Sequence, residues 1–471
     1  MSSVIGVYGM GVMGQSLALN IARHEYQVSV YNYEKEVTEK FMRERVKEET
    51  IVPTFTEEQF VESLEKPKKI LMMVTAGKVV DMVIDRLLPM LEEGDILIDG
   101  GNSYYKDTIV RHERCAAKGV CYFGIGISGG EMGALKGPSL MPSGSKEAYA
   151  YLAPILNDIA AKTENGEACC HYIGPDGSGH YVKMVHNGIE YGDIQIICEA
   201  YQILKAVGFG NDEIQKIFEK WNQGKLNSYL IEITSEILKV KDPKTGKWLV
   251  DMILDVASQK GTGKWTSMEG LDMGVAIPTI AQSVFARCMS AVKDERVVAS
   301  RIFDEKPSYN IDKKTIVNDL EEALYCAKII SYAQGFALLK EASHLHNWDL
   351  QFGEIALTWR QGCIIRARFL EDIKKAFDHD PECPNLMVTD EFAPKLKNTA
   401  QYLRKIVLTA IGNGLYIPAF SSALGYYDGY RSEQLPANLL QAQRDYFGAH
   451  TYQRVDSDRS MNFHTQWEEI K

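Results

Sequence analysis

The sequence predicts an N-terminal α/β domain followed by a large all-helical domain and a C-terminal tail. In the first third, short β-rich runs alternate with helix-patterned stretches, an alternation typical of parallel βαβ units. These runs cover residues 4–8, 27–31, 70–74, 96–98 and 120–125. From about residue 180 to 424, long amphipathic patterns dominate and predict helices. We therefore expect domains at 1–177, 178–434 and 435–471.

Composition narrows the class of protein. The 471 residues are 45% hydrophobic and carry a formal net charge of −11, which argues against a surface that binds nucleic acid. The nine cysteines include no CxxC pair, so we expect reduced, mostly buried thiols and no metal site. No signal peptide and no apolar run of about 18 residues is recognisable. We expect a soluble, cytoplasmic protein that does not bind membranes.

Two pairs of similar segments lie in the helical part. Trp-Asn-Gln-Gly at 221–224 resembles Trp-Arg-Gln-Gly at 359–362, and the stretch 199–205 loosely resembles 334–340. These similarities predict an internal duplication of a helical unit.

Residues 9–14 carry a GxGxxG pattern, formed by Gly9, Met10, Gly11, Val12, Met13 and Gly14. The pattern is weak by itself, but here it follows the first predicted strand and opens an amphipathic helix. The glycines then allow a tight turn, close approach of a pyrophosphate, and close helix–strand packing. The helix N-terminus adds N–H donors and positive potential. We predict a Rossmann-type dinucleotide-binding domain rather than a turn without a ligand.

The end of the second predicted strand bears on the choice between NAD and NADP. An acid at this place binds the ribose 2′-hydroxyl and repels a 2′-phosphate. The chain has Asn32 there, followed by Tyr33 and Glu34. The missing acid slightly favours NADP, whereas Glu34 and the absence of a following Arg allow NAD.

The first helix of the helical part carries candidate catalytic groups. Lys183, Asn187 and Glu190 are spaced i, i+4 and i+7, which places them on one helix face, with His186 and Tyr191 beside it. At a rise of about 1.5 Å per residue, the Lys and the Glu lie roughly 10 Å apart along the axis. A small substrate fits between such a base and acid. The alternative is a solvated Lys/Glu surface face, which is common.

Cations that could hold an anionic substrate are also clustered. Residues 260–266 read Lys-Gly-Thr-Gly-Lys-Trp-Thr, which we interpret as a small flexible loop suited to phosphate or carboxylate. Arg287 and Arg444 are further candidates, because guanidinium binds phosphate bidentately. Taken singly, each is better explained as a solvated surface charge.

Together these segments resemble the 6-phosphogluconate dehydrogenases over the whole chain. The stretches that carry the resemblance are 9–14, 100–102, 127–131, 137–139, 179–191, 260–266, 285–287 and 437–452. The shorter 3-hydroxyacid dehydrogenases look similar in the glycine fingerprint, the Ser-Gly-Gly turn and the lysine helix. They lack the duplicated helical domain and the C-terminal arm.

The resemblance implies oxidative decarboxylation of 6-phosphogluconate to ribulose 5-phosphate with reduction of NADP, in the pentose phosphate pathway and in gluconate use. It implies that Lys183 is the base and Glu190 the final acid. The implied substrate contacts are Asn102, Ser128, Gly129, Gly130, His186, Asn187, Tyr191, Lys260 and Arg287, completed by Arg444 and His450 from the partner in a homodimer. The implied cofactor contacts are residues 9–14, Asn32, Tyr33, Glu34, Val74, Thr75, Ala76 and Asn102. No metal is implied.

One departure from the family pattern concerns the cofactor. Members usually have Asn-Arg-Thr or Asn-Arg-Ser at the second strand end, where this chain has Asn-Tyr-Glu at 32–34. Two other functions are also considered. A non-decarboxylating NAD(P)-dependent 3-hydroxyacid dehydrogenase would release no CO2, and a catalytically silent nucleotide-binding or scaffold protein would lose the acid–base pair that is present here.

Overall fold

The computed structural model describes residues 2–47, 50–259, 261–304 and 311–468. The chain separates into two compact units, Met1–Leu424 and Gly425–Lys471, and each is described by itself. The domain boundaries expected from the sequence stay predictions.

The first unit begins with a seven-stranded sheet in the order β3-β2-β1-β4-β5-β6-β7. The strands are β1 (Ile5–Tyr8), β2 (Val28–Tyr31), β3 (Ile51–Pro53), β4 (Lys69–Met72), β5 (Ile96–Asp99), β6 (Cys121–Ser128) and β7 (Ser139–Ser143). The first six pair in parallel and β7 runs antiparallel to β6. The five predicted runs are all strands. The sequence interpretation missed β3 and β7, which are short and each contain a proline, a residue depleted in strands.

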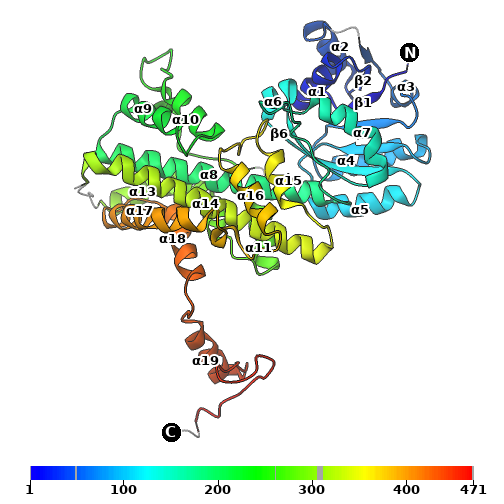
Figure 1. Ribbon diagram of the computed structural model, residues 1–471. Coiled ribbons are helices and arrows are strands. Elements are labelled where there is room, and N and C mark those ends of the chain that lie inside the picture. Colours follow the sequence, from blue (N-terminus) through cyan, green and yellow to red (C-terminus); the bar gives the residue numbers. More distant parts are fainter. Residues whose placement is uncertain (1, 48–49, 260, 305–310, 469–471) are drawn as a thin grey trace. The chain divides into compact units, whose positions relative to one another are not determined.

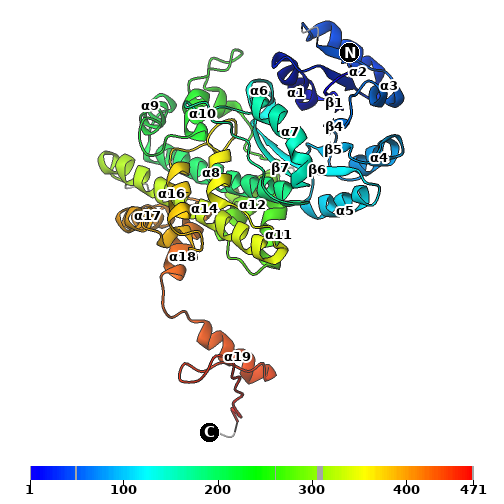
Figure 2. The same ribbon diagram turned by 45° about the vertical axis from the view of Figure 1, so that its right-hand side comes forward.

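Helices cover both faces of the sheet (Figure 2). One face packs against α1 (Val12–Arg23), α2 (Lys35–Glu44), α6 (Gly130–Lys136) and α7 (Lys146–Ile159). The other packs against α3 (Glu57–Glu62), α4 (Lys78–Leu87) with the 3-10 turn η1 (Leu88–Met90), and α5 (Tyr105–Ala116). The strand order changes direction between β1 and β4, and in open α/β sheets the ligand crevice lies at such a point, outside the carboxyl ends of the strands.

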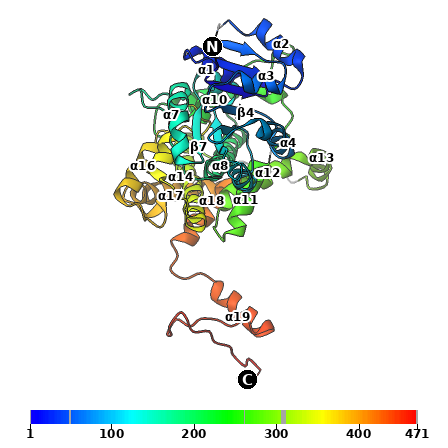
Figure 3. The same ribbon diagram turned by 90° about the vertical axis from the view of Figure 1, so that its right-hand side faces the viewer.

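The rest of the first unit is helical and is built on two long helices that pack together (Figure 1). These are α8 (Ser178–Val207) and α14 (Lys313–His346). The others are α9 (Asn211–Trp221), α10 (Tyr229–Leu238), η2 (Leu249–Met252), α11 (Thr262–Asp272), α12 (Pro278–Ala291), α13 (Lys293–Ile302), α15 (Phe352–Thr358), α16 (Leu370–His379), η3 (Leu386–Val388), α17 (Ala393–Gly412) and α18 (Pro418–Tyr430). Helices α11 and α12 both pack on α8, as Figure 3 shows.

The helices show a repeated order, and the internal duplication stays a prediction. Each long helix is followed by a short helix with a buried tryptophan at its end: Trp221 is the last residue of α9, and Trp359 directly follows α15. The contacts between the halves are also reciprocal. Glu199 of α8 accepts the N–H groups of Ala419 and Phe420 at the start of α18. Gln334, which occupies the matching place in α14, accepts the N–H of Thr279 at the start of α12.

The second unit contains α19 (Ala437–Gly448) and a strand-like bridge between Tyr452 and Phe463. Its centre is the buried carboxylate of Asp445, which accepts the indole N–H of Trp467 (2.9 Å) and the backbone N–H of Thr451 (3.0 Å). Throughout the described ranges, no helix combines the length and the apolar character that a membrane span requires.

Candidate active site

The glycine fingerprint forms the turn between β1 and α1. Gly9 has a φ of +101°, and a Cβ added there would lie 2.6 Å from the carbonyl oxygen of Met73. A Cβ on Gly14 would lie 2.0 Å from the carbonyl oxygen of Gly9. By contrast, a Cβ on Gly11 would meet no described atom within 4 Å. Two glycines are therefore needed for packing, and the middle one opens the backbone to a ligand, as a pyrophosphate requires.

The end of β2 lies beside this turn. The backbone N–H of Met10 donates to Asn32 Oδ1 (2.9 Å), and Asn32 Nδ2 donates to the Glu34 carboxylate (2.7 Å). The ring of Tyr33 is 70% exposed and lies 5.2 Å from the guanidinium of Arg86. The chain thus places Asn32 at the position where a dinucleotide-binding domain recognises the adenosine ribose, with the Glu34 carboxylate beside it.

A cavity of about 940 Å³ joins the fingerprint to the helical part. From the sheet it is lined by Gly11, Val12, Met13, Gly14, Met73, Val74, Thr75, Ala76, Gly100, Gly101, Asn102 and Ile127. From the helices it is lined by Asn187, Glu190, Tyr191, Ser258, Gln259, Thr262, Trp265 and Arg287. The sequence predicted a contact role for most of these residues, and the cavity brings them together.

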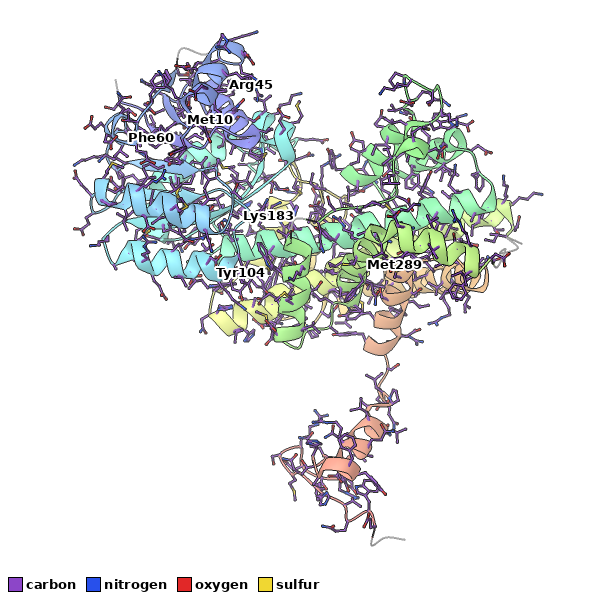
Figure 4. All side chains as sticks on the ribbon, turned by 180° about the vertical axis from the view of Figure 1, so that it is seen from behind. Met10, Arg45, Phe60, Tyr104, Lys183 and Met289 are labelled. Carbon is purple, nitrogen blue, oxygen red and sulfur yellow. The ribbon has the colours of Figure 1, made fainter. Side chains whose placement is uncertain are left out.

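Helix α8 carries the candidate catalytic groups: Asn187, Glu190 and Tyr191 line the cavity, and Lys183, labelled in Figure 4, lies on the same helix. Lys183 Nζ lies 3.5 Å from His186 Nδ1, which lies 3.9 Å from a carboxylate oxygen of Glu190. The same histidine nitrogen is 3.0 Å from Asn187 Oδ1. Lys183 is 6% exposed and His186 is fully buried, so the face is not a solvated surface face.

Burial perturbs the protonation of all three groups. Desolvation lowers the pKa of Lys183, which favours the neutral amine that a base requires, although Glu190 acts in the opposite direction. Desolvation also raises the pKa of Glu190, which favours the protonated form that an acid requires. For His186, burial and then the charge of Lys183 hold the pKa well below its usual value. The pair is suited to general base and acid chemistry.

The Ser-Gly-Gly turn after β6 lies close to these groups. Ser128 Oγ is 3.3 Å from His186 Nε2, and Gly129 and Gly130 begin α6 with φ values of +120° and +62°. The imidazole of His186 also packs edge to face against Trp359 (5.6 Å between ring centroids). In the sequence this tryptophan is noticeable only as part of the repeated Trp-x-Gln-Gly segment, and a place in the site was not predicted for it.

At the predicted cationic loop, the structure differs from the sequence-based expectation. Residues 262–266 belong to a helix and not to a flexible loop, because α11 begins at Thr262 and includes the exposed Lys264. The helix is anchored on α8 by the hydroxyl of Thr266, which donates to the carbonyl oxygen of Met184 (2.9 Å). Lys260 lies outside the described residues.

Arg287 of α12 does line the cavity. Its guanidinium lies 3.4 Å from the ring centroid of Tyr191, and it donates to the carbonyl oxygen of Ser258 (3.3 Å).

Arg444 and His450 belong to the second unit. Arg444 donates to Gln441 within α19 (3.1 Å), and the ring of His450 packs against Phe447. Both are exposed in the single chain. Among the residues that the structure describes, no group of three or more His, Cys, Asp or Glu side chains is arranged to hold a metal ion.

Four cavity residues from one segment were missed in the sequence: Ser258, Gln259, Thr262 and Trp265. Trp265 was inside the segment interpreted as a phosphate loop, and its place in the wall follows from the helix that the segment forms.

This fold and this site define a dinucleotide-dependent oxidoreductase with a helical substrate domain. Comparison with known families agrees. Residues 4–174 match the NAD binding domain of 6-phosphogluconate dehydrogenase, and residues 179–467 match the 6-phosphogluconate dehydrogenase C-terminal domain. The chain belongs to the 6-phosphogluconate dehydrogenase family.

Individual relatives are similar over almost their whole length. The NADP(+)-dependent, decarboxylating 6-phosphogluconate dehydrogenase of Bacillus subtilis is 54% identical over 98% of each chain. The decarboxylating enzyme of Escherichia coli is 52% identical over 98% of each chain. The structure of Plasmodium falciparum 6-phosphogluconate dehydrogenase, described in apo form, with NADP+ and with 6-phosphogluconate, superposes with a TM-score of 0.95 at 46% identity. That match covers 98% of this chain and 100% of the other.

Proposed function

We propose that the protein oxidises and decarboxylates 6-phosphogluconate, producing ribulose 5-phosphate and CO2 while reducing NADP. The observation that carries the proposal is the single cavity in which the glycine fingerprint and the Asn187–Glu190 face meet. Lys183 lies at the same end of α8, beside His186. The family match gives this arrangement its substrate class, and a cytoplasmic location fits the same function.

The dinucleotide fits the residues around the cavity. The open side of Gly11 and the N-terminus of α1 would hold the pyrophosphate, and Asn32 would lie at the ribose. When bound, NADP supplies the hydride acceptor. The cofactor assignment is supported by the relative from Bacillus subtilis, which is named as NADP(+)-dependent.

The residues of the chain would then move protons in three stages. Neutral Lys183 takes the proton of the C3 hydroxyl as the alcohol is oxidised. The resulting ammonium group donates to the C3 carbonyl while the carboxylate leaves as CO2, since a polarised β-keto acid decarboxylates without a metal. Glu190, whose pKa is raised by burial, delivers a proton to C1 of the enediol. Asn102, Ser128 and His186 would orient the sugar acid.

A homodimer with shared sites would supply the remaining cations. We propose that Arg444 and His450 of one subunit complete the substrate pocket of the other. The first unit exposes large apolar side chains on neighbouring helices, including Phe285, Met289 and Phe303, which suit a subunit interface. Figure 4 labels Met289 among them.

The rates with different substrates test the proposed activity. Purified protein should reduce NADP with 6-phosphogluconate and much more slowly with gluconate or 3-hydroxyisobutyrate; the reverse order would contradict the proposal.

Mixing two inactive variants tests whether the subunits share a site. Lys183→Ala and Arg444→Ala proteins should each be inactive alone. After they are unfolded and refolded together, about a quarter of the activity should return, because half of the random dimers contain one intact site. No recovery would contradict a shared site.

A further inference from the structure

A buried carboxylate joins the sheet to the helices beside the cavity. Glu269 of α11 is 1% exposed, and three consecutive side chains from the start of α5 converge on it. The hydroxyls of Tyr104 and Tyr105 donate to it over 2.7 and 2.9 Å, and Lys106 Nζ lies 2.9 Å from it. One carboxylate therefore holds two parts of the chain that are more than 160 positions apart in the sequence.

On both sides of this contact, residues close in the sequence line the cavity. On the sheet side, Tyr104 comes two residues after Asn102, which lines the cavity. On the helix side, Trp265 precedes Glu269 by one helical turn and lines the same cavity. The rings of Tyr104 and Trp265 are in contact, with centroids 5.1 Å apart. A displacement of Glu269 would therefore move both walls.

The connection also reaches the catalytic helix. The ring of Tyr105 packs edge to face on Tyr181 (4.8 Å), which lies two residues before Lys183 in α8. The charge balance is favourable as well. Burial alone would raise the pKa of Glu269, but hydrogen bonds from Tyr104, Lys106 and Tyr105 lower it, so the carboxylate is ionised against its ammonium and hydroxyl partners.

We propose that Glu269 is a positioning residue that fixes the distance between the Asn102 turn and the α8–α11 wall of the active site. Glu269 itself is not among the residues that line the cavity. It acts by holding Asn102 and Trp265 in the geometry that the bound sugar acid requires. The proposal rests on the proposed activity of the same cavity, and it adds a contact between the sheet and the helical substrate domain.

The variant Glu269→Gln keeps the size of the side chain and removes its charge. We expect kcat with 6-phosphogluconate to fall about tenfold or more, since small misplacements of reacting groups are costly. The Kd for NADP, measured by titration, should change less than about threefold, because the partners of Glu269 are Tyr104, Tyr105 and Lys106 and not the fingerprint residues 9–14. Tyr104→Phe and Tyr105→Phe, each of which removes one hydrogen bond, should lower kcat in the same direction.

A matched control separates positioning from loss of stability. Asp95 is also a buried carboxylate and accepts the N–H groups of Lys68 and Glu92, but it lies at the amino end of β5, away from the cavity. Asp95→Asn should lower Tm without lowering kcat at a temperature where the protein is folded. The proposal is overturned if Glu269→Gln keeps kcat within twofold, or if Asp95→Asn loses as much. If Glu269→Gln does not fold, unchanged kcat in both Tyr→Phe variants overturns it. An inactive wild-type protein would instead contradict the proposed function.

Discussion

Glu34 should weaken the preference for NADP, and removing its charge should strengthen that preference. The hydrogen bond from Asn32 holds the Glu34 carboxylate at the end of β2. For a 2′-phosphate bound beside this carboxylate we assume a charge separation of about 5 Å, the scale of a close contact between charged groups. At that distance, two unit charges repel by about 0.8 kcal/mol in water and about 3 kcal/mol at an effective dielectric constant of 20. Because Glu34 is exposed, we take the repulsion as about 1–2 kcal/mol. This corresponds to about a 5- to 30-fold change in the preference for NADP over NAD.

The assay compares kcat/KM for NADP and NAD with 6-phosphogluconate. In Glu34→Gln the ratio of NADP to NAD should rise about 5- to 30-fold, and less at high ionic strength because salt screens exposed charges. The double change Tyr33→Arg, Glu34→Thr should raise the ratio further. Glu36→Gln, on the same helix but beyond the strand end, is the control and should leave it unchanged. An unchanged ratio in Glu34→Gln would mean that the 2′-phosphate is recognised elsewhere.

Three further changes test the catalytic face and its support. Lys183→Ala should abolish turnover and leave dinucleotide binding intact; measurable steady-state activity would remove it as the base. Glu190→Gln should slow turnover and leave only one limb of the bell-shaped profile of kcat/KM against pH, because the carboxyl group whose pKa is raised by burial is no longer present. A bell-shaped profile that is unchanged in this variant would exclude Glu190 as the acid. Lys328→Met breaks the fully buried pair with Asp193 in the helix core. It should lower the free energy of unfolding by about 3–5 kcal/mol in urea denaturation, and an unchanged midpoint would contradict the pair's structural role.

Local features of the fold were predictable from the sequence. The fingerprint turn depends on contacts between neighbouring segments, and the spacing of Lys183, Asn187 and Glu190 fixes a helix face whatever surrounds it. The family resemblance is confirmed by matches over both parts of the chain. The roles of the individual site residues stay predictions.

Features that depend on distant packing were not predictable. Residues 260–266 have the glycine content of a loop, but Gly263 is close-packed against the ring of Tyr191, where a Cβ would lie 2.6 Å away. This contact and the Thr266 hydrogen bond stabilise a helix that the local sequence disfavours. Trp359 and Glu269 were missed for the same reason, since their partners in the site are more than 160 residues away.

The most direct test of the central proposal measures two products in one reaction. Purified protein is incubated with 6-phosphogluconate labelled at C1 and with NADP, and the released CO2 and the NADPH formed are quantified together. The proposed chemistry predicts one CO2 for each NADPH throughout the reaction. NADPH formation without CO2 would contradict it and would identify a non-decarboxylating 3-hydroxyacid dehydrogenase.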